Sequence, residues 1–203
     1  MMKENYQALM EKEFENIEKG GKKPTLLLQC CCAPCSSAVL ERLKEHFDLK
    51  IYFYNPNIYP QEEYEKRLGE FEKLLFSPRF AEKIEMVPSE YSQGDFENAI
   101  KGYENEKEGG ARCEKCFRLR LFETAKKAKE TGADYFCTTL TVSPHKNAEL
   151  LNKIGEEAEK EYGVKFLRSD FKKKEGYKRS IELSNELNLY RQNYCGCKYS
   201  IWF

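Results

Sequence analysis

Long hydrophobic runs are missing from this sequence of 203 residues. No stretch approaches the roughly 18 consecutive apolar residues that a membrane-spanning helix needs. The first twenty residues are polar and charged, without the apolar run that a secretory signal peptide carries. We therefore expect a cytoplasmic protein in a reducing compartment, with no membrane partner.

The sequence also has no net charge, because 34 basic residues balance 34 acidic ones. A formal charge of zero argues against a protein that binds any polyanion through its overall field. The basic residues are unevenly placed, however, with clusters between residues 112 and 130 and between residues 165 and 179. These segments could bind phosphates, or they could be solvated helix faces with ordinary ion pairs.

Two common phosphate-binding signatures are absent as well. The chain contains neither a GxGxxG nor a GxxxxGK[ST] sequence, which argues against an ordinary nucleotide-hydrolysing enzyme. It also shows no internal repeat, no low-complexity segment and no convincing domain boundary. The sequence therefore predicts a single domain over residues 1–203.

Cysteine, by contrast, is plentiful. Nine cysteines are present, and two of them, Cys30 and Cys137, lie in apolar segments and are interpreted as buried hydrophobic residues. The others form three short groups: Cys31, Cys32 and Cys35, then Cys113 and Cys116, then Cys195 and Cys197. Close-spaced thiols in an intracellular chain indicate metal or redox chemistry. Their number exceeds the four that one zinc ion or one four-iron cluster takes from protein, which predicts two metal sites, or one with additional thiols.

Short apolar runs alternate with segments of helical periodicity. The pattern predicts strands at residues 25–30, 50–54, 83–87, 135–140 and 164–167. It predicts helices at residues 34–46, 61–76, 93–101, 114–131, 146–162 and 173–187, and an N-terminal helix within residues 1–20. Strands separated by helices of this length form parallel βαβ units. The expected fold is therefore α/β, with one mostly parallel sheet and helices on both faces.

This layout places the first cysteine group at the carboxyl end of the first strand, where ligands bind in open α/β sheets. The group also opens a helix, whose dipole stabilises a thiolate. The middle pair lies on one face at the start of another helix. The last pair flanks Gly196, where the lack of a side chain lets the backbone approach a bulky ligand. We expect the C-terminal segment, residues 188–203, to close over the first group.

Other interpretations remain open at this point. The pairs at 113–116 and 195–197 together would suit a structural zinc ion, as in a zinc-bearing RNA-binding module. Cys32 and Cys35 have a spacing suited to dithiol exchange, as in a thiol oxidoreductase that acts on proteins. The surplus of thiols argues against the first alternative, and the second leaves two cysteine groups unexplained. His145 could belong to a site or lie on the surface at a helix start.

Six blocks of residues resemble one known family. They are Leu27–Ser36, Tyr52–Ile58, Glu63 and Tyr64 with Arg67, Arg112–Arg118, Thr139–Lys146, and Tyr190–Cys197. Together they cover nearly the whole chain and resemble the QueH family of epoxyqueuosine reductases. The resemblance implies a Rossmann-like sheet of the HUP type, related to the adenine-nucleotide hydrolases and tRNA-thiolating enzymes. The cysteines of the first block replace the pyrophosphate-binding loop of those enzymes and no SGGxDS sequence is present, so we expect no use of ATP.

The same resemblance implies the last step of queuosine biosynthesis. The enzyme would reduce the epoxide of epoxyqueuosine, at the wobble position of tRNA, to the alkene of queuosine. It would be an iron–sulfur enzyme that does not use cobalamin. Its partners would be the anticodon loop of the tRNA and an electron donor that the sequence does not identify.

The surplus of thiols fits this chemistry, because four could hold a [4Fe–4S] cluster and the others a second metal, such as a mononuclear iron. We expect the cluster ligands to be Cys113 and Cys116, completed from Cys32, Cys195 and Cys197. The candidates for the second metal or for electron relay are Cys31, Cys35 and the remaining terminal thiol.

Proton delivery and tRNA binding need residues of other types. Asp170 and His145 are the candidate proton donors. Arg191 and Gln192, beside the last thiols, are expected to bind the base or the ring hydroxyls. The candidate phosphate contacts are Arg112, Arg118, Lys172, Lys173, Lys174, Lys178 and Arg179.

Overall fold

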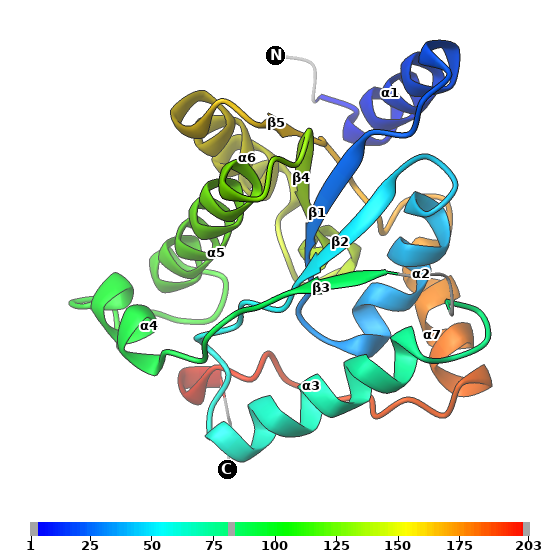
Figure 1. The fold of residues 1–203 in the computed structure, drawn as a ribbon. Coiled ribbons are helices and arrows are strands. Elements are labelled where there is room, and N and C mark those ends of the chain that lie inside the picture. Colours follow the sequence, from blue (N-terminus) through cyan, green and yellow to red (C-terminus); the bar gives the residue numbers. More distant parts are fainter. Residues whose placement is uncertain (1–3, 81–83, 201–203) are drawn as a thin grey trace.

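The computed structural model describes residues 4–80 and 84–200, which contain a five-stranded parallel sheet (Figure 1). Its strands are β1 (Thr25–Gln29), β2 (Asp48–Tyr52), β3 (Glu85–Val87), β4 (Tyr135–Thr138) and β5 (Lys165–Phe166). The order is β3-β2-β1-β4-β5, with every neighbouring pair parallel. The chain thus builds outward from β1 to one edge and then returns to build the other, as Rossmann-like sheets do. The predicted fold class is confirmed.

Seven α-helices and two 3₁₀ helices are found in the described part of the chain. They are α1 (Tyr6–Gly20), α2 (Ala33–Leu43), α3 (Gln61–Leu75), α4 (Gln93–Ile100), α5 (Ala111–Glu130), α6 (Ala148–Tyr162) and α7 (Gly176–Glu186), with η1 (Thr139–Val142) and η2 (Lys198–Ser200). None of the helices described is long and apolar enough to span a bilayer. Each predicted helix has its counterpart here, with ends that differ by a few residues.

Each predicted strand has its counterpart, with ends that differ by one or two residues. The strand predicted over 135–140 ends at Thr138, because the Thr138 hydroxyl accepts a hydrogen bond from the Leu140 N–H and begins η1. Residue 83 of the predicted strand 83–87 lies outside the described residues. The single domain over residues 1–203 stays a prediction, since residues 1–3, 81–83 and 201–203 are not described.

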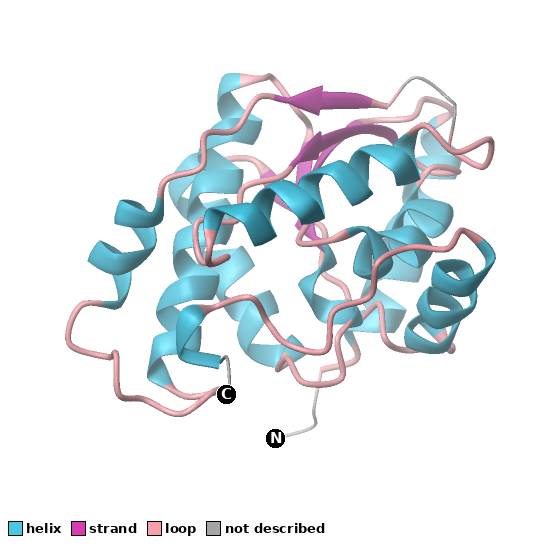
Figure 2. Cartoon of the chain, turned by 90° about the horizontal axis from the view of Figure 1, so that it is seen from below, coloured by secondary structure: helices cyan, strands magenta, loops and turns pink. Residues whose placement is uncertain are grey.

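The central strand is buried on both faces. Leu26 and Leu28 pack with residues of α1, α2 and α3, while Leu27 packs with residues of α5 and α6. Successive side chains of a strand point to opposite faces, so a continuous apolar strand needs a helical layer on each side. Figure 2 shows these helices lying around the strands.

The segment after α7 crosses the molecule without regular structure until η2 (Figure 1). At its start, the Tyr190 N–H donates to Glu70 of α3 over 3.0 Å. Farther along, the Gly196 carbonyl accepts from the Tyr59 N–H over 2.8 Å, and the Tyr199 hydroxyl bonds to Glu97 of α4. The segment is therefore held at several points along its length.

Candidate metal and active site

A cavity of about 770 Å³ lies at the carboxyl ends of the central strands. Its walls come from the segments that follow β1, β2 and β4, and from α3, α5 and the C-terminal segment. The depression is of the size that encloses a small molecule or one unstacked base. This is the position at which parallel α/β sheets bind their ligands.

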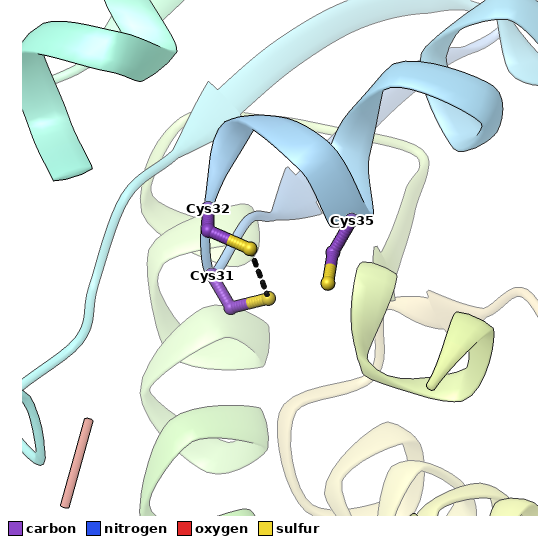
Figure 3. A group of neighbouring side chains, drawn as sticks. All are labelled: Cys31, Cys32 and Cys35. Atoms are coloured by element: carbon purple, nitrogen blue, oxygen red, sulfur yellow. Dashed lines mark hydrogen bonds between the residues drawn. The ribbon is translucent and has the colours of Figure 1, made fainter. Parts of the chain in front are cut away.

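Three cysteines of this cavity form the first thiol group: Cys31, Cys32 and Cys35. Their side chains converge at the start of α2 (Figure 3). The three sulfurs lie within 4.8 Å of one another, and the Cys31 and Cys32 sulfurs are 3.7 Å apart. Thiolates around one tetrahedral ion with 2.3 Å metal–sulfur bonds are separated by about 3.8 Å. The first thiol group therefore fits three ligands of a single metal ion.

Electrostatics within the first thiol group favour one thiolate. Hydrogen bonds from Cys32 and Cys35 hold the pKa of Cys31 well below its usual range. The same contact with Cys31 raises the pKa of Cys32 to about 12, and the contacts with Cys31 and Cys32 raise that of Cys35 well above normal. The lowered pKa favours the thiolate form of Cys31, and a thiolate is the form that binds metal.

The other four cysteines of the three sequence groups form the second thiol group: Cys113, Cys116, Cys195 and Cys197. Cys116 and Cys197 pack with Phe96 and Ile100 of α4, and Cys195 lies against them. Burial raises the pKa of Cys116 to about 12 and that of Cys197 to about 11, and burial raises that of Cys113 as well. In each case negative charge on other thiols of the group also raises the pKa, which shows that the four side chains are close to one another.

The second thiol group is more widely spaced than the first. Within the described residues, no three of its sulfurs fall within 4.8 Å of one another. A four-iron cluster suits such spacing, because each thiolate binds a different iron at a corner of the cluster. Cys195 also lines the cavity beside the first thiol group. The C-terminal segment thus brings the two thiol groups next to each other.

The structure groups one cysteine differently from the ligand set expected above. Cys32 lies with Cys31 and Cys35, whereas that set placed it with the pair on α5. Cys30 and Cys137 are completely buried, which confirms that they are core residues. Nothing in the sequence indicated which thiols of the first group would converge, since that depends on the turn into α2.

The two candidate proton donors lie in different surroundings. His145 is exposed and lines the cavity. Asp170 accepts a hydrogen bond from the Lys172 ammonium over 2.8 Å and does not belong to the described cavity wall. The structure therefore brings His145, and not Asp170, to the cavity.

The predicted tRNA contacts divide into four sets. Arg191 and Gln192 line the cavity. Arg112 is buried and donates to the carbonyls of Glu104 and Glu106. The ion-paired set consists of Arg118 with Glu157, Lys172 with Asp170, Lys174 with Glu11, Lys178 with Glu175, and Arg179 with Glu41, Glu182 and Glu186. Lys173 has no ion pair among the described residues. Their role in tRNA binding stays a prediction.

Three basic residues of the cavity were not assigned a role from sequence: Arg67, Arg120 and Lys146. Arg67 binds Glu63 over 2.7 Å and donates to the Cys195 carbonyl over 3.0 Å, so it anchors the C-terminal segment. A signal for Arg120 was present, because Cys113, Cys116 and Arg120 are spaced i, i+3 and i+7 and therefore share one face of a helix.

Comparison with known proteins shows the family of this chain. A family model described as epoxyqueuosine reductase QueH matches residues 26–202. Proteins named epoxyqueuosine reductase QueH are similar to this chain. The Streptococcus pyogenes protein is 41% identical, over 97% of this chain and 78% of its own length. The Staphylococcus epidermidis protein is 43% identical, over 97% and 84%. The Thermotoga maritima protein is 39% identical, over 87% and 90%. With matches of this extent, the predicted resemblance is confirmed, and this chain belongs to the QueH family.

Proposed function

We propose that this chain is an epoxyqueuosine reductase that acts on tRNA in the last step of queuosine biosynthesis. The epoxide takes up two electrons and two protons, loses its oxygen as water and becomes the alkene of queuosine. The observation that carries the proposal is the cavity at the carboxyl edge of the sheet, with three converging thiols in its wall and four more beside it. Relatives that carry this name are matched over most of their length.

We propose further that the second thiol group holds a [4Fe–4S] cluster and that the first thiol group holds a mononuclear iron. The wide spacing of the second group and the close spacing of the first support this division. When bound, the cluster would supply single electrons and the mononuclear iron would act as a Lewis acid toward the epoxide oxygen. This division revises the expected ligand set by moving Cys32 to the mononuclear site.

Two side-chain amides in the cavity wall suit the recognition of a base. The side-chain oxygens of Asn57 and Gln192 are buried, and neither has a hydrogen-bond partner among the described residues. A buried acceptor without a partner is costly, and a base edge or a ring hydroxyl offers the missing donor. These amides would therefore hold the modified base with its epoxide facing the first thiol group.

His145 is the proposed proton donor. Its ring lies at the wall of the cavity and is accessible to solvent, so it can be reprotonated after each turnover. The two electrons must come from a donor outside the chain and enter one at a time.

The test is an anaerobic assay on tRNA that carries epoxyqueuosine, with dithionite as the electron source. Nucleosides from the digested tRNA are analysed by mass spectrometry, and we expect a product lighter by one oxygen atom. Cys35→Ser should lose the conversion, whereas Cys137→Ala, which changes a buried thiol outside both groups, should keep it. Wild-type protein that is replete in iron and sulfide but leaves the tRNA unchanged would contradict the proposal.

A further inference from the structure

Arg120 lies between the two thiol groups. It belongs to α5, on the same face as the Cys113 and Cys116 of the second thiol group. It also lines the cavity beside the first thiol group. Cys116 lies one helical turn before Arg120 on α5, and Cys31, Cys32 and Cys35 share the cavity wall with Arg120.

The guanidinium of Arg120 is buried without an anionic partner. Its side chain is 2% exposed, and its one hydrogen bond within the described chain goes from Nη2 to the Asn55 side-chain oxygen over 2.7 Å. The Nε–H has no partner. Arg67 is buried to the same extent but is paired with Glu63 over 2.7 Å. A buried charge is unfavourable unless an opposite charge compensates it. None of the described carboxylates compensates the charge of Arg120.

A chain of buried hydrogen bonds fixes the guanidinium in this place. The Asn55 amide donates to the carbonyl of Cys30, the residue before the first thiol group, over 2.8 Å. The Gln29 amide donates to the Tyr54 carbonyl over 3.0 Å, and its oxygen accepts from the Thr138 hydroxyl over 2.9 Å. The ends of β1, β2 and β4 therefore hold Asn55, and Asn55 holds Arg120.

Lys146 is a second cation without a carboxylate partner. It follows η1, is partly buried and lines the same cavity, and its ammonium has no ion pair in the described part of the chain. Cys31 and Cys35 of the first thiol group and Cys195 of the second line this cavity together with Lys146. Lys146 thus faces thiols from both groups.

We propose that Arg120 and Lys146 are the counter-ions of the metal-bound thiol groups, and that Arg120 raises the reduction potential of the iron–sulfur cluster. The inference rests on the proposed function, because it needs the cluster. Each electron that enters the cluster adds one negative charge. A fixed cation in a poorly hydrated site stabilises that charge, so the cluster accepts an electron from a weaker donor.

The test is the midpoint potential of the cluster in anaerobically reconstituted protein, titrated with dithionite and followed by electron paramagnetic resonance. Arg120→Gln removes the charge and should shift the reduction equilibrium at least tenfold toward the oxidised cluster, which corresponds to about 59 mV more negative for one electron. Lys146→Met should shift the potential in the same direction by less, since Lys146 is nearer to solvent. Arg120→Lys keeps the charge and should stay close to wild type.

Lys127→Met is the matched control, because Lys127 belongs to the same helix and pairs at the surface with Glu130 over 2.7 Å. Its potential should equal that of the wild type. Potentials of Arg120→Gln and Lys146→Met that also equal the wild-type value, in protein with full iron and sulfide, would overturn the inference. If circular dichroism shows that Arg120→Gln does not fold, Lys146→Met decides by the same criterion. Wild-type protein that takes up no iron and sulfide would instead contradict the proposed function.

Discussion

The two thiol groups are built in different ways. The first comes from five consecutive positions, Cys31 to Cys35, where β1 turns into α2. The second joins two thiols of α5 to two of the C-terminal segment, more than 75 positions later in the chain. A local group keeps its geometry as long as one strand–helix turn is intact, whereas an assembled group also depends on docking of the terminal segment.

This difference bears on function. A local group at the cavity can hold one ion in a defined position toward the substrate. An assembled group would hold a cofactor between α5 and the C-terminal segment, so binding of the cofactor would depend on both. The two sites should therefore respond separately to mutation.

The largest effect is expected from the second thiol group. The double substitution Cys113→Ser and Cys116→Ser removes both ligands that α5 provides. Acid-labile sulfide should fall from about four per chain to nearly none, because the remaining two thiols cannot hold a four-iron cluster. Iron should fall to the single ion of the first group. Sulfide that remains at the wild-type level would show that the cluster lies elsewhere.

The reverse loss is expected from the first thiol group. Cys35→Ser should remove about one metal ion per chain and abolish epoxide reduction, because the remaining two thiols hold an ion poorly. The visible absorbance of the cluster and its bleaching by dithionite should persist. Metal analysis and the visible spectrum measure both effects, and joint loss of ion and cluster would contradict two independent sites.

Docking of the terminal segment can be weakened without changing a thiol. A Cβ at Gly196 would lie 2.9 Å from Arg67 Nη1, and Gly196 has a φ of +98°. Gly196→Ala should cost about 1–3 kcal/mol of unfolding free energy from crowding, in addition to the cost of positive φ. It should also lower the iron and sulfide content of the second group only.

Gly102 provides the matched comparison, since its φ is +86° and a Cβ there meets nothing within 4 Å. Gly102→Ala should show the backbone cost alone in denaturant unfolding, with a normal metal content. Equal unfolding free energies for the two variants would mean that the added Cβ is accommodated at Gly196 and that crowding of Arg67 does not weaken the segment.

The smallest effect should come from the basic residues, and it should leave both thiol groups filled. Changing Lys172, Lys173 and Lys174 to Ala should weaken tRNA binding and lower the slope of log K against log salt by about 0.7 for each phosphate that is no longer neutralised. Lys172 and Lys174 are ion-paired in the free protein, so part of the gain from phosphate binding offsets the loss of those pairs. Filter binding across salt concentrations measures the slope, and binding equal to that of Lys127→Ala at every salt would contradict the assignment.

The sequence predicted the elements well, because apolar periodicity and strand spacing are local properties. It also predicted the family, since the motifs span nearly the whole chain. The sequence placed Cys31, Cys32 and Cys35 in one group, but the convergence of their three sulfurs depends on the turn into α2 and could not be predicted. The ion pairs of the basic residues could not be predicted either. Lys174 and Glu11, like Arg179 and Glu41, are distant in sequence and meet only in the folded chain.

The surroundings of Arg120 also could not be predicted from the sequence. The helical spacing of Arg120 from Cys113 and Cys116 is visible in the sequence. Only the folded structure shows that no described carboxylate pairs with Arg120. The hydrogen bonds from Thr138 through Gln29 to Asn55 join β4, β1 and the segment after β2, and no local pattern predicts them.

We propose that the two thiol groups hold different metal centres, and metal analysis of the wild-type protein tests this proposal most directly. The protein is purified anaerobically, and iron, zinc and acid-labile sulfide are measured per chain. We predict about four sulfides and five irons, four of them in a cluster and one in the first thiol group. Zinc without sulfide, after anaerobic reconstitution with iron and sulfide, would contradict the account.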